Sequence, residues 1–553
     1  MPRTFLKKST MRRDNRTHGE KQSDELTLRG GIKASSTVLV CAFNKPIAVE
    51  FEEKLRRGIG LVREWSPQQT EIHTWFKKAK SGDNLVVVAR AGTGKSTTIL
   101  GALDFIPGRP KIEVKTLHAL GFSYLRENWP KAKIDDRNEV EWDRIDEAVD
   151  KVGGREMTLD ERKLLKKFVG RAKGTVAELS EPALRDVLGA MDEAAAVQNG
   201  AVDLLVALCA RVLKASLVPD YESRISFDDM LFVPVFNGWV KPRYDRVVVD
   251  EAQDMNAIQL RLAQGACRKN GNLAFVGDDM QAIYGFRGAD SGCLARLQSE
   301  TDAKQLGLTI TYRCPKSVVA LAQTLVPDFT AHESAPDGVV RDLPFEKLSE
   351  DVQPGDAILS RINAPLVGVC LDLLTRDMRA VIKGKDIGEG LMAIVKKVGK
   401  ADSINAFLEA LGIWRNDRVE RIIAADKGSK KRKDDELSEA GEKKIEELTD
   451  RVNCIQAIAE SVNTIEAMRA KLDALFVDRP DAARVITCSS VHKAKGLEWP
   501  RVFVLEDSFN YVGRRKGPDG APLPPSPEEN NIRYVAITRA KEELVQVRGR
   551  RVK

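Results

Sequence analysis

Residues 84–104 read NLVVVARAGTGKSTTILGALD, and this stretch decides the fold of the chain. Leu85 to Ala89 form an apolar run without alternation, which is typical of a parallel strand covered on both faces. A glycine-bearing loop follows, ends in Lys95-Ser96 and leads into a segment with apolar residues at helical spacing. Strand, loop, Lys-Ser and helix in this order predict a phosphate-binding loop.

The residues of this loop suit a nucleoside triphosphate. Backbone N–H groups of the loop can wrap the β- and γ-phosphates, Lys95 supplies a point charge, and the Ser96 hydroxyl can hold Mg²⁺. The pattern departs from its usual form at Ala89, where the first glycine is common. A chance glycine-rich turn is the alternative, and the flanking strand and helix argue against it. The loop alone predicts nucleotide binding without specifying a reaction.

The composition predicts a soluble protein of several domains. Of the 553 residues, 31% are charged and 42% hydrophobic, and no stretch is long and apolar enough for a membrane span or a signal peptide. The eight cysteines include no C-x-x-C pair, which predicts a reduced, cytoplasmic protein without a zinc site or disulfides. Nine Lys/Arg and four Asp/Glu in residues 1–36 supply +5 of the net charge of +7. This tail can bind nucleic acid or be merely solvated, and the sequence leaves both open.

Polar residues follow two further predicted strands. Asp250 and Glu251 come directly after the strand Arg246–Val249, and Gln281 comes shortly after the strand Leu273–Val276. Because the carboxyl ends of parallel strands share one sheet edge, Asp250 can hold Mg²⁺ while Glu251 orients and deprotonates a water. Gln281 can donate a hydrogen bond to a γ-phosphate.

Arg313 and Arg539 lie in a second predicted α/β region. Arginines stabilise the charge that develops during phosphoryl transfer, and one such residue is worth ~10³–10⁵ in rate. If both come from a second domain, hydrolysis requires that the cleft between the domains close, which couples catalysis to domain motion. The alternative for each arginine is a surface position in a basic helix.

Together these motifs resemble the UvrD/Rep group of superfamily 1 DNA helicases, over roughly residues 37–125, 225–385 and 484–545. The resemblance implies an α/β fold of two RecA-like parallel-sheet P-loop NTPase cores, each with a mainly helical insert. The expected parts are a basic, disordered tail at 1–36, the first core at 37–125 and 225–300, its helical insert at 126–224, the second core at 301–384 and 481–553, and a short helical accessory insert at 385–480.

The resemblance also implies roles for individual residues. The residues implied to bind and hydrolyse MgATP are Lys95, Asp250, Glu251, Gln281, Arg313 and Arg539, with Ser96 and Asp250 at the metal. The further nucleotide contacts are Gln69, Ala91, Gly92, Thr93, Gly94, Thr97, Arg287, Tyr312, Gly496 and Glu498, of which Gln69 and Tyr312 hold adenine. Single-stranded DNA is expected to cross both cores and to touch Phe43, Asn44, Thr116, His118, Tyr284, Phe286 and His492, where aromatic rings can stack on bases.

Two features depart from the family pattern. The insert at 385–480 is shorter than the accessory domain of better-known relatives, which leaves duplex engagement open. The segment Ala42–Lys45 (AFNK), which relatives carry after the phosphate-loop helix, here precedes the loop. We therefore predict that residues 38–57 form a permuted strand and helix of the first core. A disordered N-terminal appendage is the alternative.

The predicted function is an ATP-dependent, Mg²⁺-requiring translocase and helicase that moves 3′→5′ on DNA. Its expected partners are single-stranded DNA and single-strand/duplex junctions, and its expected state is a monomer. The polarity rests on the family resemblance alone. Two rivals stay open, namely a translocase that strips proteins from single strands without unwinding, and a nucleotide-gated DNA-binding module without productive turnover.

Overall fold

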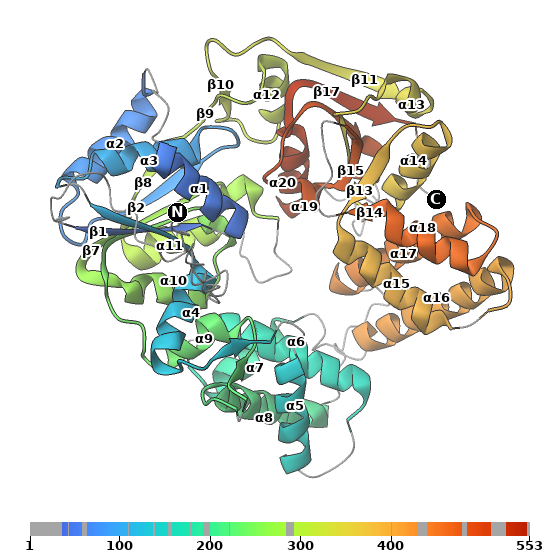
Figure 1. The fold of residues 1–553 in the computed structure, drawn as a ribbon, viewed down its shortest axis with the longest axis horizontal. Helices are drawn as coiled ribbons and strands as arrows, with labels where there is room; N and C mark the ends of the chain where they lie inside the picture. The colour runs from blue at the N-terminus through green and yellow to red at the C-terminus, as the bar shows by residue number, and fades with distance from the viewer. Residues whose placement is uncertain are drawn as a thin grey trace, which may run out of the picture.

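The computed structural model describes residues 36–42, 44–57, 64–108, 110–135, 139–152, 157–175, 178–191, 199–220, 222–283, 292–399, 401–427, 439–477, 484–509 and 527–549. The fold is α/β and is built on two all-parallel sheets of six and seven strands, as the sequence predicts. Helices cover both sheets, and two helical inserts extend from them (Figure 1).

The first sheet has the strand order β3-β1-β6-β7-β2-β8. Helices α1 (Lys45–Arg57), α2 (Pro67–Lys78) and α3 (Lys95–Asp104) pack on one face, and α4 (Leu117–Asn128), α10 (Ala257–Ala266) and α11 (Cys293–Thr301) pack on the other. The strands are β1 (Thr37–Ala42), β2 (Asn84–Ala89), β3 (Lys111–Thr116), β6 (Tyr244–Val249), β7 (Cys267–Gly277) and β8 (Ala303–Leu308).

Strand β1 lies inside this sheet, between β3 and β6. Val38 pairs with Ile112 on one side and with Arg246 on the other. Its apolar residues alternate between the two hydrophobic faces, and residues 38–42 are at most 1% exposed. The structure thus has a strand and a helix where the sequence predicts them, in the first sheet. The permutation relative to the family pattern stays a prediction.

The chain between α4 and β6 forms the helical insert and its return to the sheet. It contains α5 (Glu139–Val152), α6 (Leu159–Thr175), α7 (Glu181–Gly189), α8 (Asn199–Ser216), α9 (Asp229–Phe236) and the short parallel pair β4 (Lys133–Ile134) and β5 (Arg224–Ile225). Inside it, Lys173 Nζ lies 2.7 Å from Asp229 and 2.8 Å from Glu141, and Arg144 lies 2.6 Å from Asp229. Because these buried charges neutralise one another, their desolvation cost is largely offset.

The second sheet has the strand order β11-β17-β16-β12-β15-β13-β14. Helices α12 (Lys316–Ala322), α19 (Val491–Ala494) and α20 (Pro527–Ile537) share a hydrophobic cluster with one face. The other face packs against α14 (Ala364–Thr375) and the accessory helices α15 (Lys385–Val398), α16 (Ile404–Lys427), α17 (Glu439–Glu460) and α18 (Ile465–Leu475). The strands are β11 (Val339–Pro344), β12 (Ala357–Ser360), β13 (Ala380–Lys383), β14 (Phe476–Val477), β15 (Ile486–Ser490), β16 (Trp499–Leu505) and β17 (Ala540–Arg548).

Two boundaries differ from the sequence prediction. Strand β8 pairs with β2, so the first sheet continues beyond residue 300, where the second core was expected to begin. Strand β14 falls within the expected accessory insert but pairs with β13 in the second sheet. Both lie at sheet edges, and neither has a strong apolar run, because β8 (AKQLGL) contains polar residues and β14 has only two residues. Their hydrogen-bonded pairing, of β8 with β2 and of β14 with β13, shows which sheet each strand joins.

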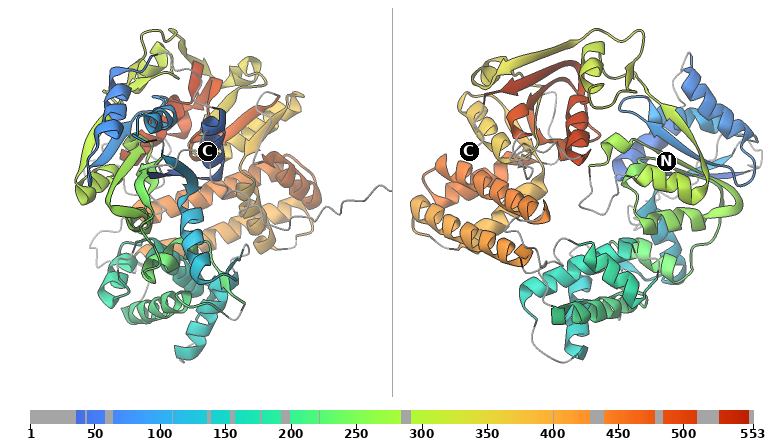
Figure 2. Two further views of the ribbon diagram at one scale, coloured as in Figure 1. Left: turned by 60° about the vertical axis from the view of Figure 1, so that its left-hand side comes forward. Right: turned by 180° about the vertical axis from the view of Figure 1, so that it is seen from behind.

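The two sheets lie side by side, each with a helical insert on the same side of the molecule (Figures 1 and 2). Helices α19 and α20 lie on the side of the second core that faces the first. Within the described residues, every helix is either too short or too polar to cross a lipid bilayer.

Candidate active site

The loop between β2 and α3 needs its glycines. Gly92 has a φ of 69° and Gly94 a φ of 77°, in the left-handed region. A Cβ on Gly92 would lie 2.5 Å from Cβ of Arg313 and 2.6 Å from Oγ1 of Thr311. Both the backbone conformation and this close approach therefore require glycine. Helix α3 begins directly after Gly94, so its first N–H groups point into the loop.

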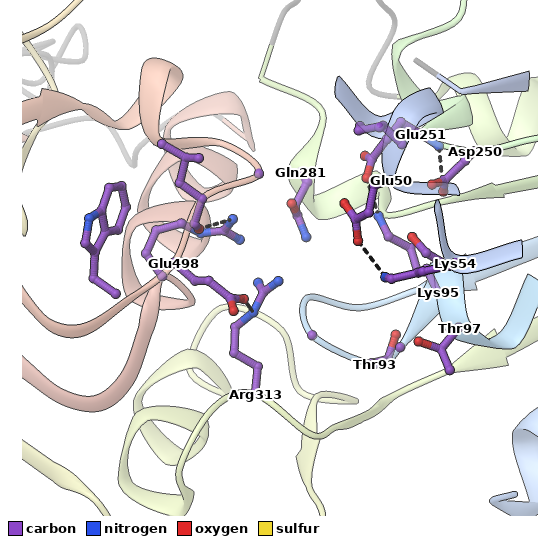
Figure 3. A pocket seen from close by; sticks show the side chains of 18 of the residues that line it. Glu50, Lys54, Thr93, Lys95, Thr97, Asp250, Glu251, Gln281, Arg313 and Glu498 are labelled. Carbon is purple, nitrogen blue, oxygen red and sulfur yellow. Dashed lines mark hydrogen bonds and ion pairs between the residues drawn. The ribbon is translucent and has the colours of Figure 1, made fainter. Parts of the chain in front are cut away.

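A cavity of about 700 Å³ lies in front of this loop, between the two cores (Figure 3). All six residues expected from the sequence to act in hydrolysis line it. From the first core, the lining residues are Ile47, Glu50, Lys54, Gly92, Thr93, Gly94, Lys95, Ser96, Thr97, Asp250, Glu251 and Gln281. The remaining lining residues are Arg313, Lys383, Thr487, Gly496, Leu497, Glu498, Trp499 and Arg539.

Glu251 is held against the lysine of the phosphate-binding loop. Lys95 Nζ donates to Glu251 Oε1 at 2.9 Å, and Gln253 Nε2 donates to Oε2 at 2.6 Å. Glu251 has a φ of 54°, a strained conformation for a residue with a side chain, and such strain clusters at functional sites. Burial alone would raise the pKa of Glu251, but Lys95 and Lys495 outweigh it and hold the pKa below its usual value.

Asp250 follows β6 directly and is 3% exposed. Its backbone N–H donates to the Cys41 carbonyl at 3.0 Å, so β1 supports its position. Burial and, after it, the Glu251 carboxylate raise the pKa of Asp250, and a hydrogen bond with Ser96 opposes this. A hydroxyl and a carboxylate in contact beside a phosphate-binding loop are oxygen ligands of the kind that Mg²⁺ takes. Ser96 and Asp250 therefore fit a magnesium site.

Arg313 and Arg539 differ in their partners. Arg313 Nε lies 2.5 Å from Glu498 Oε2. Arg539 is 1% exposed, and burial and then the nearby Arg313 lower its pKa to about 10. Among the described residues, no carboxylate lies within ion-pair distance of Arg539, whose guanidinium donates only to the carbonyls of Val535 and Leu497 and the hydroxyl of Thr538. This buried, unneutralised cation fits an anionic group in the cavity.

Gln281 and Lys495 join the two cores at the cavity wall. Gln281 Nε2 donates to Asp278 Oδ2 at 2.8 Å. Lys495 Nζ, from the second core, donates to the Gln281 carbonyl and to Asp254 Oδ2, each at 2.7 Å. A displacement of Gln281 therefore reaches the second core through a single side chain.

Three expected nucleotide contacts do not line the cavity. Gln69 is buried beneath the loop, where it completes the capping box of α2 and both ends of its amide are bonded within the first core. Ala91 packs into the hydrophobic cluster of the second core. Tyr312 is 47% exposed, and its ring centroid lies 4.8 Å from that of His332. Arg287 lies outside the described residues.

Expected DNA contacts gather where β1 and β3 end side by side. Asn44 Oδ1 and Thr116 Oγ1 each accept a hydrogen bond from the first turn of the helix that follows, at 3.0 and 3.1 Å. The ring of His118 stacks on Phe227 with centroids 4.1 Å apart, and Phe227 is 57% exposed. Burial lowers the pKa of His118 to about 4, so this ring is neutral at pH 7. Sequence reasoning did not assign Phe227.

On the second core, His492 belongs to α19 and hydrogen-bonds to the backbone of Ile283 in the first core. Burial, followed by the charge of Arg361, lowers its pKa to about 3. The remaining expected DNA contacts, Phe43, Tyr284 and Phe286, lie outside the described residues.

The chain is similar in sequence to known proteins. The family model described as "UvrD/REP helicase N-terminal domain" matches residues 107–302. The chain is 25% identical to YjcD of Bacillus subtilis (58% of this chain, 55% of YjcD), 24% to UvrD2 of Mycobacterium tuberculosis (83% and 71%), and 24% to PcrA of Staphylococcus epidermidis (58% of each). It thus spans little more than half the length of YjcD and of PcrA. UvrD2 and PcrA are both named ATP-dependent DNA helicases.

The chain is therefore UvrD/Rep-like in sequence: it is similar to this family model and to these named helicases. In this UvrD/Rep-like chain, α1 also supplies cavity residues that sequence reasoning missed. Glu50 and Lys54 form an ion pair of 2.5 Å and line the cavity beside Lys95 (Figure 3). Lys383 and Thr487 of the second core line it as well. None of the four sits in a recognisable motif, so only the tertiary structure reveals them.

Proposed function

We propose that this chain is an ATP-driven DNA helicase that moves 3′→5′ on single-stranded DNA and unwinds duplex at junctions. One observation carries the proposal. The phosphate-binding loop and the Asp250–Glu251 pair of the first core share a single cavity with Arg539 of the second core. The names of UvrD2 and PcrA support the reaction class, and the resemblance to the UvrD/Rep group supports the polarity.

Lys95 and Glu251 would carry the hydrolytic step. The Lys95 ammonium, which here contacts Glu251, is also the point charge that a bound triphosphate attracts. When Lys95 turns to the phosphates, the Glu251 carboxylate is released to accept a proton from the attacking water. Ser96 and Asp250 would hold Mg²⁺, which neutralises phosphate charge when it is bound.

The two arginines make hydrolysis depend on the position of the second core. Arg539 is fixed to the last turn of α20 and brings a positive charge to the cavity wall. Charge that develops on the phosphoryl oxygens is stabilised only if that wall stands close to the loop. Each turnover thus requires the cores to approach and then separate, and this cycle is the motion of a translocase.

DNA would lie along the edge at which β1 and β3 end. The exposed Phe227 ring, backed by His118, offers a face on which a base can stack. Helix α1 begins after Asn44 at this edge and carries Glu50 and Lys54 in the nucleotide cavity. A single rigid helix therefore touches both the DNA edge and the nucleotide site.

The test measures ATP hydrolysis with and without single-stranded DNA, and unwinding of partial duplexes with 3′ or 5′ tails. We expect hydrolysis to rise at least ~10-fold with DNA and unwinding to require a 3′ tail. Hydrolysis and protein displacement without unwinding would restrict the activity to translocation. Tight nucleotide and DNA binding without turnover would overturn the proposal.

A further inference from the structure

The first two residues of the phosphate-binding loop, Arg90 and Ala91, contact the second core. The Ala91 side chain lies in the hydrophobic cluster of that core. The Ala91 N–H donates to the hydroxyl of Tyr534, on α20, at 3.0 Å. The preceding residue, Arg90, reaches the same core through Asp328, whose carboxylate accepts hydrogen bonds from Nε and Nη2 at 3.0 Å each. Two adjacent loop residues therefore contact the second core directly.

Tyr534 is connected in turn to Arg539. The Thr538 hydroxyl donates to the Tyr534 carbonyl at 2.9 Å. Arg539 Nη2 donates to Thr538 Oγ1 at 3.1 Å, and Arg539 Nε donates to the Val535 carbonyl at 2.9 Å. Tyr534, Thr538 and Arg539 are all at most 1% exposed. A series of buried hydrogen bonds thus runs from the loop N–H of Ala91 to the guanidinium.

We propose that Tyr534 is a positioning residue for ATP hydrolysis, whose hydroxyl ties the orientation of Arg539 to the phosphate-binding loop. This inference rests on the proposed function, in which Arg539 acts on the nucleotide. Two of the three neutral acceptors that hold the Arg539 side chain, the Val535 carbonyl and the Thr538 hydroxyl, lie at the end of α20, so the direction of the side chain depends on the direction of that helix end. Because a displacement of about 1 Å in a catalytic group costs ~10²-fold in rate, a hydrogen bond that fixes the helix end to the loop affects turnover.

The Tyr534 ring and the Tyr534 hydroxyl have separable roles. The ring packs in the second core, edge-on to Phe329 with centroids 5.6 Å apart, and this contact survives in Tyr534→Phe. The hydroxyl is the only part of the side chain that meets the Ala91 N–H. Tyr534→Phe therefore removes this hydrogen bond between the cores, together with the 3.5 Å contact from the hydroxyl to Asp278 Oδ2, while it preserves the packing.

The first experiment compares Tyr534→Phe with Tyr244→Phe. The control also loses a hydroxyl contact, a partly buried one to Glu113 at 2.8 Å, but at the start of β6, the end of the strand away from Asp250. We expect Tyr534→Phe to bind a fluorescent ATP analogue within about threefold of wild type, while its DNA-stimulated kcat falls at least ~10-fold. The control should keep wild-type kcat. A wild-type kcat in Tyr534→Phe would overturn the inference.

A double-mutant cycle with Thr538→Val tests the series itself. If both residues act through one connection, the double variant loses no more kcat than the more impaired single variant. Multiplying losses would mean that they act independently and would contradict the series. Arg539→Ala distinguishes the proposed function, in which Arg539 acts on the nucleotide, from the proposed positioning role of Tyr534. Normal kcat in Arg539→Ala would defeat the proposed role of Arg539, whereas an inactive Arg539→Ala beside a normal Tyr534→Phe would defeat only the role of Tyr534.

Discussion

Lys95 Nζ lies 2.9 Å from Glu251 Oε1, so the cation suited to phosphates and the carboxylate suited to water activation restrain each other. The second carboxylate oxygen of Glu251 accepts a hydrogen bond from Gln253, so both oxygens of this side chain are held in place. In the proposed function, Lys95 would bind the nucleotide and Glu251 would act in hydrolysis, so substitution of each residue can distinguish the two steps.

Lys95→Ala and Glu251→Gln should separate binding from chemistry. We expect Lys95→Ala to weaken ATP binding at least ~10-fold, because a charge at the phosphates is lost. Glu251→Gln should bind MgATP nearly normally and hydrolyse it at least ~10²-fold more slowly. Fluorescence titration and phosphate release measure the two effects. Glu113→Gln, which alters another 2.9 Å lysine–carboxylate pair, formed by residues that do not line the cavity, should behave as wild type. Normal turnover in Glu251→Gln would contradict its role.

Arg539→Ala should lower DNA-stimulated kcat at least ~10³-fold with little change in ATP affinity, because its charge acts in the transition state. Arg539→Lys should recover little, since an ammonium cannot reproduce the fork that contacts three acceptors. Arg501→Ala, which removes a second-core arginine paired with Asp351 and Glu543, serves as the control. If Arg539→Ala and Arg501→Ala have the same kcat, Arg539 has no specific role in hydrolysis.

Phe227→Ala should weaken binding of single-stranded DNA by ~5- to 150-fold, which corresponds to ~1–3 kcal/mol for one stacked base. ATP affinity without DNA should not change, because Phe227 does not line the nucleotide cavity. Val218→Ala removes another exposed apolar side chain, 59% exposed, and should leave DNA affinity unchanged. Anisotropy titration with a labelled oligonucleotide measures both variants, and equal affinities would show that Phe227 is ordinary surface.

His118 should stay neutral well below pH 6.5, because burial lowers its pKa to about 4. The unfolded chain therefore binds the proton first as the pH falls, so this residue stabilises the fold above pH 6.5 and loses that contribution toward pH 4. Between pH 7 and pH 5 the loss is about 2 kcal/mol. Titration of the histidine NMR signals should give a pKa near 4 for His118 and a higher value in Phe227→Ala. A wild-type pKa near 6.5 would refute its burial.

Deletion of residues 1–34 should spare folding and ATPase activity, whereas deletion of residues 1–57 should abolish soluble folding. The longer deletion removes β1, which pairs with β3 and β6, and would expose two unpaired strand edges. The shorter deletion removes most of the basic tail and should only reduce the salt-sensitive part of DNA affinity. Soluble yield, ATPase rate and DNA titrations at two salt concentrations measure these effects. An active protein without residues 1–57 would contradict the role of β1.

Local patterns were sufficient for the phosphate-binding loop, the Asp250–Glu251 strand end and the strand at 38–42. In each case an apolar run is followed directly by turn or polar residues. Because these residues are neighbours in the chain, they stay together in the fold. The parallel order of the strands also followed, because alternating strands and helices leave few other solutions. The edge strands β8 and β14 were misplaced because the polar residues of β8 and the two residues of β14 say little about which sheet they join.

Tertiary structure alone decided which residues complete the site. Gln69 caps α2 beneath the loop, Glu50 and Lys54 line the cavity, and Phe227 is exposed beside His118, although none of the last three belongs to a motif. The contact between Ala91 and Tyr534 joins residues 443 positions apart in the chain. No local pattern encodes such a pair. It arises because Ala91 and Ile283 of the first core share a hydrophobic cluster with the second core, and the packing of that cluster brings the loop N–H to the Tyr534 hydroxyl, which satisfies it.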